Sequence, residues 1–267
     1  MSTPRPDFTK QWSLLIDIEG FGATYDAGSQ ALLSLGVLME GIYKIGSRCL
    51  KESPNRIFAH QIGDGFIVLG EFAWESLEEP LSVTVALLRT ILMRGGVGKA
   101  ALHEGQFADI VGCYPKVIQE QYARSGGGAF PLGGGLMTVF PVMGQALIDT
   151  NRLISAAPSG ALLVIWKKDL TRLPQGVVTE CSGDLCVLDW IHTSFPHLQQ
   201  LLKDSALLNP EPPLMITMLE RYLSANKLPE EWIGNTRRYL HLDKGACLPT
   251  PEDAGRLNKS PGWQPDC

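Results

Sequence analysis

The stretch Leu14–Gly22, LLIDIEGFG, decides the fold, because it is an apolar segment that holds a lone aspartate, Asp17, and then runs into a tight turn. An apolar segment of this length is typical of a buried β-strand. Burying a carboxylate without a partner costs several kcal/mol. Asp17 therefore either lies at the exposed end of the strand or meets a positive partner. Gly20 and Gly22 allow the backbone to turn sharply directly after it.

Composition and charge narrow the class of protein. The chain has 267 residues, of which 45% are hydrophobic and 19% are charged, as in ordinary soluble globular proteins. No apolar stretch approaches the roughly 20 residues that cross a bilayer, and the first ten residues lack the apolar core of a secretion signal. We expect a cytoplasmic protein with no membrane segment. The net charge of −5 argues against a broad nucleic-acid surface and leaves room for a phosphorylated small molecule.

The cysteines show neither a C-x-x-C pair nor the spacing of a zinc site. In a chain without a secretion signal, scattered thiols indicate free cysteines in a reducing cytosol. A Cys181–Cys186 disulfide is the alternative. The six cysteines are Cys49, Cys113, Cys181, Cys186, Cys247 and Cys267.

The first part of the chain alternates strand and helix patterns. The expected elements are a strand at 11–18, a helix at 27–50, strands at 56–62 and 66–72, a helix at 78–93 and a strand at 96–102. Between the paired strands, Gly63-Asp64-Gly65 is a strong hairpin signal.

The later part is less regular. Two triple-glycine runs in 104–135 predict a loop without regular structure. The segments expected after it are a strand at 136–140, a helix at 142–157, short strands within 160–166, 176–181 and 185–190, and leucine-rich helices within 196–241.

The β-α-β-β-α-β order predicts an α+β fold, a ferredoxin-like mixed sheet with helices on one face. We expect one domain over 10–195, a helical extension over 196–245 and an irregular tail over 246–267.

Asp17 and Asp64, which are 47 positions apart, would meet at one edge of such a sheet. Taken singly, each aspartate has an ordinary structural explanation. Asp64 fits the chemistry of a turn, and Asp17 fits a strand-end residue that hydrogen-bonds to backbone amides. The pair on these two elements is more specific, because adjacent carboxylates repel unless a proton or cation intervenes. Hard oxygen ligands suit Mg²⁺ or Mn²⁺.

The segments LLIDIEGF and HQIGDGF resemble the strand and hairpin motifs of class III nucleotidyl cyclase catalytic domains. The segment VMGQALIDTNRLISAAPSG looks like the same family's helix, with Arg152 eight residues after Gly144. LMRGGVGKA occupies the place of the family's fourth strand and lacks the residues of a phosphate loop. The resemblance spans roughly residues 10–190.

This resemblance implies a two-metal mechanism. Asp17, Asp64 and the main-chain carbonyl of Ile18 would bind two Mn²⁺ or Mg²⁺ ions, one activating the ribose 3′-hydroxyl and the other holding the triphosphate. The residues implied to bind the nucleotide are Glu19, Gly20, Phe21, Gly22 and Gly63, with backbone amides facing the phosphates.

Arg152 would reach the site of a second subunit and stabilise charge on the α-phosphate. The family therefore implies a head-to-tail homodimer with composite sites. In isolation, Arg152 reads as a helix residue stabilised by the helix dipole.

At the two positions that recognise the base in this family, the chain has unusual residues. His60 and Pro141 occupy the two positions that usually read adenine or guanine, and neither serves the usual purine hydrogen bonds. The chain looks like the pyrimidine cyclases of bacterial antiphage signalling, with UTP preferred and CTP next, and a separate effector protein sensing the product.

Ile148 replaces the asparagine that usually contacts the ribose. This departure keeps two alternatives open: a catalytically silent cyclase-like domain that binds a nucleotide or a partner protein, and a purine cyclase with a divergent pocket.

Overall fold

Strand β1 (Thr9–Ile18) lies inside the main sheet, between β3 (Gly65–Gly70) and β4 (Gly98–Asp109), and pairs with both in antiparallel register. The computed structural model describes residues 9–20, 29–50, 57–70, 75–126, 128–177 and 179–242. The hairpin partner of β3, β2 (Ile57–Ile62), forms one edge of the sheet. The predicted strand–hairpin–strand arrangement is therefore confirmed.

The sheet continues beyond β4 with three short strands. These are β8 (Leu163–Trp166), β10 (Leu185–Leu188) and the other edge strand, β9 (Thr179–Ser182). Among the strands that the structure describes, only the β4–β8 pairing is parallel, so the eight-stranded sheet that they form is mixed, as the sequence predicts.

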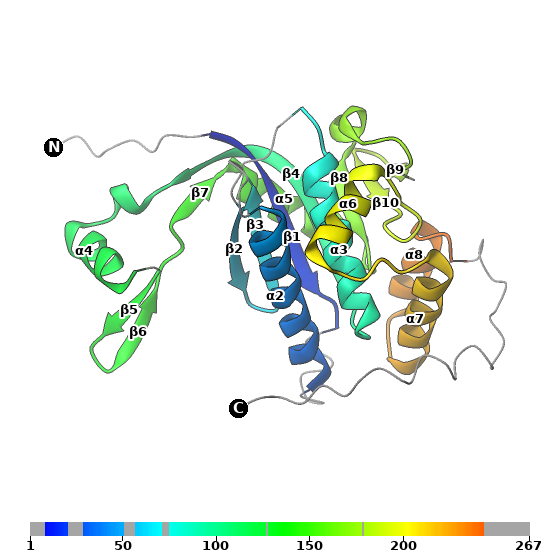
Figure 1. Ribbon diagram of the computed structural model, residues 1–267, viewed down its shortest axis with the longest axis horizontal. Coiled ribbons are helices and arrows are strands. Elements are labelled where there is room, and N and C mark those ends of the chain that lie inside the picture. Colours follow the sequence, from blue (N-terminus) through cyan, green and yellow to red (C-terminus); the bar gives the residue numbers. More distant parts are fainter. Residues whose placement is uncertain are drawn as a thin grey trace.

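Helices cover both faces of this sheet, so the expectation of helices on one face is wrong. Helices α2 (Ser29–Cys49) and α3 (Glu78–Met93) pack on one face, and α5 (Gln145–Ala156) packs on the other (Figure 1). The physical reason is that β4 and β8 carry apolar side chains on both faces, and Leu153 of α5 buries the second set.

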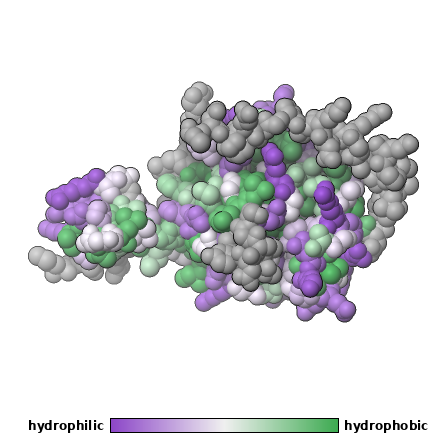
Figure 2. Space-filling view, turned by 90° about the horizontal axis from the view of Figure 1, so that it is seen from below, coloured by the Kyte–Doolittle hydropathy of each residue, from purple (hydrophilic) through white to green (hydrophobic). Residues whose placement is uncertain are grey.

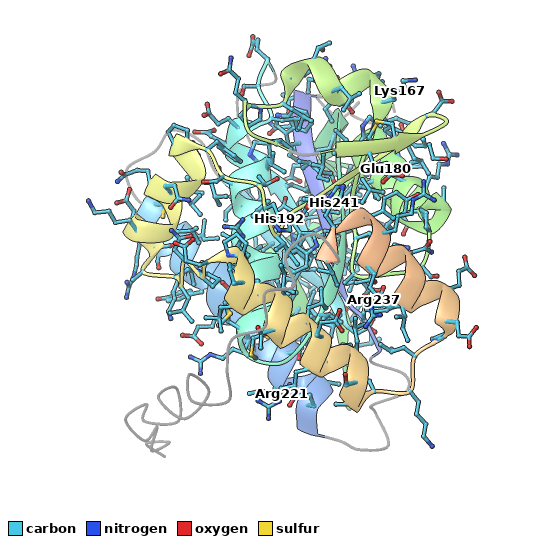
Figure 3. The ribbon with its side chains drawn as sticks, turned by 90° about the vertical axis from the view of Figure 1, so that its right-hand side faces the viewer. Lys167, Glu180, His192, Arg221, Arg237 and His241 are labelled. Carbon is cyan, nitrogen blue, oxygen red and sulfur yellow. A yellow bond between two sulfur atoms is a disulfide. The ribbon has the colours of Figure 1, made fainter. Side chains whose placement is uncertain are left out.

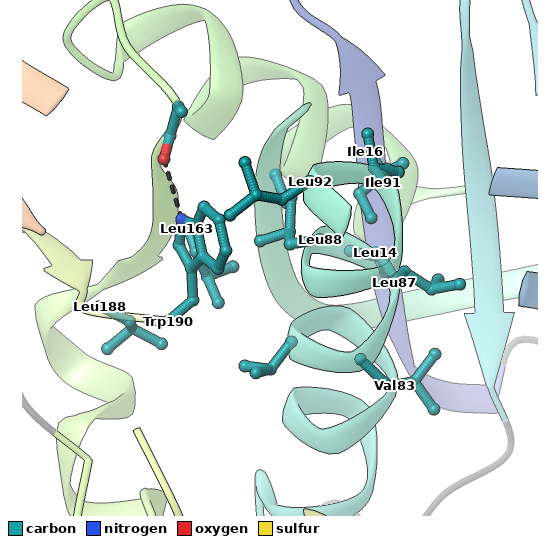
Figure 4. Close-up of a cluster of buried hydrophobic side chains, with 14 of the residues drawn as sticks. Leu14, Ile16, Val83, Leu87, Leu88, Ile91, Leu92, Leu163, Leu188 and Trp190 are labelled. Atoms are coloured by element: carbon teal, nitrogen blue, oxygen red, sulfur yellow. Dashed lines mark hydrogen bonds between the residues drawn. The ribbon is translucent and has the colours of Figure 1, made fainter. Parts of the chain in front are cut away.

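The larger core lies between the sheet and α3. Alternate residues of β1, including Leu14 and Ile16, point towards Leu87 and Ile91 of α3 (Figure 4). Beyond the last strand, Trp190 is buried in the same cluster, and its indole Nε1 donates to the carbonyl of Ala161 at 2.9 Å. Arg89 of α3, also buried, donates to the Trp190 carbonyl at 2.9 Å.

The segment predicted as an unstructured loop, 104–135, is an arm with regular structure. β4 continues to Asp109, and the arm then contains η2 (Val111–Cys113), α4 (Lys116–Ser125), β5 (Ala129–Leu132) and β6 (Gly135–Thr138), before β7 (Val142–Gly144) returns to β4. Figures 1 and 2 show it extending away from the sheet as a separate lobe. The prediction failed because Gly133 and Gly134 form the tight turn of a hairpin, where glycine favours a positive φ of 59° at Gly133.

The predicted helical structure within 196–241 is confirmed, and in the described part of the chain it consists of α6 (Pro196–Ser205), α7 (Pro212–Ala225) and α8 (Glu230–Tyr239). Their buried side chains, among them Leu198, Met215 and Trp232, belong to the same apolar cluster as β1. The extension thus shares the core of the sheet. Figure 3 shows α7 and α8 side by side, and Arg237 of α8 pairs with Glu220 of α7 at 2.7 Å.

A disulfide joins Cys181 and Cys186, so the interpretation of all cysteines as free thiols is wrong. The two residues face each other across the β9–β10 hairpin, which brings their Cα atoms within 4.0 Å. Cys49 is a free thiol. Cys247 and Cys267, and with them the predicted tail, lie outside the described residues. Within the described ranges, no helix combines the length and apolar character needed to cross a bilayer.

Gly144→Ala tests how tightly β7 packs on β4. A Cβ at Gly144 would lie 2.1 Å from the carbonyl oxygen of Gln106 and 2.4 Å from the Cα of Phe107, and backbone atoms cannot yield cheaply. We expect a loss of about 2 kcal/mol or more in the free energy of unfolding, measured by urea titration. Gly36→Ala, inside α2 with nothing within 4 Å, should instead stabilise by about 1 kcal/mol. Equal effects of the two substitutions would contradict this packing.

Candidate functional site

The structure brings Asp17 and Asp64 together at one end of the sheet. Asp17 is the second-last residue of β1 and lies opposite Gly65, and the amide of Ile18 donates to the carbonyl of Asp64 at 3.3 Å. The two carboxyl groups are close enough for a side-chain hydrogen bond. Residues 47 positions apart therefore form one acidic site, made by antiparallel register alone.

Gly65 is what permits this approach. A Cβ built at Gly65 would lie 2.3 Å from the carbonyl oxygen of Ile16 and 2.9 Å from Oδ1 of Asp17. Any side chain would therefore collide with β1 and with the carboxyl group. The hairpin glycine serves the acidic site as well as the turn.

The carboxyl group of Asp17 is strongly perturbed. Burial raises its pKa from 3.8 to about 7, and repulsion by Asp64, a hydrogen bond to Asp64 and repulsion by Glu19 add to the effect. Lys99, opposite Asp17 on β4, opposes the shift. Near neutral pH the acidic pair therefore holds a proton or requires a cation.

Glu19 and Lys99 complete the charged cluster. Burial raises the pKa of Glu19, against a hydrogen bond from Trp232 and the charge of Lys99. Burial lowers the pKa of Lys99, and Glu19 and Asp17 oppose that change. The ammonium of Lys99 also donates to the carbonyl of Ala157 at 3.1 Å, which ties the site to the end of α5.

The donor set fits a small hard cation. Asp17 and Asp64 offer carboxylate oxygens, which Mg²⁺ and Mn²⁺ prefer, and Mg²⁺ usually takes one or two protein carboxylates together with phosphates and waters. In the part of the chain that the structure describes, no cluster of three or more His, Cys, Asp or Glu side chains is arranged to hold a metal by itself. A metal here would therefore depend on ligands from a bound phosphate or from water.

The residues predicted to bind the nucleotide are only partly described. Glu19 donates its amide to the carbonyl of Val97 at 3.0 Å. Gly20 and Gly63 adopt positive φ angles of 77° and 60°, where glycine is favoured. Phe21 and Gly22 lie outside the described residues.

The two predicted base-pocket residues lie near each other. The ring of His60 on β2 meets the ring of Phe140, directly before Pro141, edge-on at 4.3 Å between centroids. Partial burial lowers the pKa of His60, which favours the neutral imidazole. The carbonyl of buried Pro141 accepts from the amide of Ile110 at 2.7 Å, which holds the segment in place.

Arg152 is not brought to the acidic pair of its own chain. Its side chain is 68% exposed, and Nη1 lies 3.2 Å from Oδ1 of Asp149 on the same helix. Among the described residues its ion pair is with Asp149 and with neither Asp17 nor Asp64. Ile148, also on α5, is 46% exposed.

The sequence reasoning missed Lys99, the side chain of Glu19, and the aromatic residues Tyr222 and Trp232. The register of β1 and β4 places Lys99 opposite Asp17, and the sequence does not state this register. Nothing in the local sequence links Tyr222 and Trp232 to a turn some 200 positions earlier.

Comparison with known proteins gives structural likeness only. No protein-family model and no curated protein matches the chain. A dimeric guanylyl cyclase domain of the RhoGC fusion protein from the aquatic fungus Blastocladiella emersonii aligns with a TM-score of 0.45 and 11% identity, over 68% of this chain and 97% of that one. A bacterial light-regulated adenylyl cyclase aligns with a TM-score of 0.42 and 9% identity, over 75% of this chain and 57% of that one.

A class III adenylyl cyclase-like ATP-binding protein from Pseudomonas aeruginosa aligns at 0.39 and 12%, over 73% of this chain and 40% of that one. These TM-scores lie below 0.5.

Asp17→Asn tests the strain in the acidic pair. With a pKa of about 7 in the folded protein against 3.8 in the unfolded chain, Asp17 binds more protons when folded. The contribution of Asp17 to the free energy of unfolding is fully present below about pH 4 and is lost as the pH rises through 7. We expect the metal-free variant to exceed the native protein at pH 8 by about 1 kcal/mol, discounted for solvent screening, and to match it at pH 4.

Thermal unfolding at both pH values measures this difference. Asp184→Asn, in the exposed turn of the β9–β10 hairpin, is the matched control. It should leave the stability of the protein unchanged at both pH values. A native protein equally or more stable than Asp17→Asn at pH 8 would contradict the acidic strain.

Proposed function

We propose that this protein is a class III nucleotidyl cyclase that converts a pyrimidine nucleoside triphosphate, UTP first and CTP next, to the 3′,5′-cyclic monophosphate and pyrophosphate. The observation that carries the proposal is the pairing of Asp17 with Asp64 at the end of β1, where burial first and repulsion by Asp64 second raise the pKa of Asp17 to about 7. A fold that presses two carboxyl groups together in this way gains by binding divalent cations.

In the proposed reaction the ribose 3′-oxygen bonds to the α-phosphorus, the bond from the α-phosphorus to the oxygen bridging to the β-phosphate breaks, and pyrophosphate leaves. Asp17, Asp64 and the carbonyl of Ile18 would hold two Mn²⁺ or Mg²⁺ ions, whose charge activates the 3′-hydroxyl and neutralises the triphosphate. Lys99 holds positive charge beside the same carboxylates. Gly20 and Gly63, at positive φ, would let the backbone approach the phosphates.

Arg152 would complete the site of a second copy of the chain. Its exposed side chain, whose ion pair among the described residues is with Asp149, supports a head-to-tail homodimer. The arm supports the same assembly, because Val117, Leu132 and Leu136 are each more than 60% exposed. Apolar side chains grouped in this way are typical of contact surfaces.

The altered base pocket supports a pyrimidine. His60, edge-on to Phe140, can hydrogen-bond one edge of a small ring, and Pro141 offers no side-chain hydrogen bond to a purine. Within this proposal the product is a second messenger for bacterial antiviral defence, sensed by a separate effector protein.

Two other functions stay open. A catalytically silent domain that binds a nucleotide or a partner protein is favoured by Ile148, which offers no hydrogen bond to a ribose. A purine cyclase with a divergent pocket would share the same acidic pair and differ in substrate alone.

A substrate panel separates these functions. We expect the full-length protein with Mn²⁺ to give a cyclic product from UTP, and less from CTP, resolved by mass. Asp17→Ala and Asp64→Ala should each lower turnover by 10³-fold or more, on the order expected when metal ligands are removed. Asp184→Asn should keep native turnover. Cyclic AMP or GMP as the main product would identify a purine cyclase, and no product at all would favour the silent domain.

Mixing two inactive variants tests whether Arg152 acts across subunits. An equal mixture of Asp17→Ala and Arg152→Ala subunits, allowed to exchange, forms mixed dimers in which one of the two sites is intact. Random pairing predicts about a quarter of native turnover. A mixture no more active than its components would contradict the composite site.

A further inference from the structure

Two helices far from the acidic pair in sequence reach the turn that leaves β1. The indole Nε1 of Trp232 on α8 donates to Oε2 of Glu19 at 2.6 Å. The hydroxyl of Tyr222 on α7 donates to the carbonyl oxygen of Glu19 at 3.4 Å. The two aromatic rings lie against each other, with centroids 6.4 Å apart. One residue of the turn is thus held by both helices.

The turn has no spare room beneath Tyr222. A Cβ at Gly20 would lie 2.9 Å from the Tyr222 hydroxyl oxygen, so the backbone of the turn passes close beside this hydroxyl. On its other side the turn is fixed by the amide of Glu19, which donates to the carbonyl of Val97. The amide, the carbonyl and the side chain of Glu19 therefore each have a partner.

The side chain of Glu19 needs such a partner. Its carboxylate is the third acidic group near Asp17 and Asp64, and it adds to the repulsion there. A hydrogen bond from an indole N–H to a carboxylate is charge-assisted, so it both stabilises the charge and fixes its direction. Trp232 turns Oε2 of Glu19 towards α8.

α7 and α8 are themselves firmly placed. Trp232 and Tyr222 are 5% and 7% exposed. Directly after α8, Nδ1 of His241 lies 2.9 Å from Oδ2 of buried Asp189, and Figure 3 shows His241 next to His192, whose Nδ1 lies 2.8 Å from the same oxygen. A rigid support of this kind can hold the turn in one geometry.

We propose that Trp232 and Tyr222 are positioning residues of the nucleotide site, which makes the C-terminal helices part of the binding machinery for a metal–triphosphate. They set the path of the Glu19–Gly20 turn, and with it the last residues of β1. The inference rests on the proposed function for the identity of the ligand, while the contacts that carry it are independent of Asp64, His60 and Arg152.

The test compares Trp232→Phe, which keeps the ring and loses the N–H donor, with Tyr239→Phe. Tyr239 is on the same helix and is also 5% exposed, yet it packs in a different cluster with Ala101 and Leu153. We expect Trp232→Phe to raise KM for UTP with Mn²⁺ about tenfold, the loss typical of one hydrogen bond to a charged group, with kcat changed less than about twofold. Tyr239→Phe should keep native KM at a similar Tm.

Tyr222→Phe provides a second variant if Trp232→Phe does not fold, and it should raise KM in the same direction by a smaller factor, since its hydrogen bond is longer. Native turnover with unchanged KM in both variants would overturn the inference and leave the proposed function intact.

If the native protein turns over none of ATP, GTP, CTP and UTP, the proposed function fails, and Mn²⁺ binding followed by electron paramagnetic resonance tests the inference alone. Weaker Mn²⁺ binding in Trp232→Phe than in Tyr239→Phe would support it. Equal binding, or no binding by the native protein, would overturn it.

Discussion

The candidate site depends on the antiparallel pairing of β1 with β3, which places two carboxyl groups side by side although they repel. β1 lies between β3 and β4, so Asp17 faces Gly65 on one side and Lys99 on the other, and Asp64 follows from the hairpin turn. Much of the sheet's stability comes from the apolar residues before Asp17, which pack against α3. The packing of the core therefore holds the two carboxyl groups together against their repulsion. Carboxyl groups with such strongly shifted pKa values are typical of functional sites.

The two faces of the sheet have different roles: one holds the main core and the other carries the charged residues of the site. The face covered by α2 and α3 holds the main core, into which α6, α7 and α8 also pack. Asp17, Lys99 and His60 alternate with core residues and so belong to the face that α5 partly covers. The C-terminal helices reach around the end of β1 from the core side and contact Glu19. A rigid core and a charged site thus meet at one turn.

The fold was largely predictable because its main signals are local. The apolar run before Asp17 and the Gly63-Asp64-Gly65 turn define the strands, and chain order then places the two aspartates at one edge. The arm was not predictable, because glycine runs serve hairpin turns and loops equally well. The second helical face depends on β4 and β8 being apolar on both sides, and the disulfide depends on the register of β9 and β10. The contact of Trp232 with Glu19 joins residues 213 positions apart, and no local pattern encodes it.

The most direct measurement is a crystal structure of the full-length protein with Mn²⁺ and 3′-deoxy-UTP, which lacks the attacking hydroxyl and cannot cyclise. Anomalous scattering would locate the metals without assumptions about the ligand. The account predicts Mn²⁺ peaks at about 2.2 Å from carboxylate oxygens of Asp17 and Asp64, bridged to the triphosphate, with the uracil beside His60. A nucleotide bound elsewhere, or no metal between the two aspartates, would contradict it.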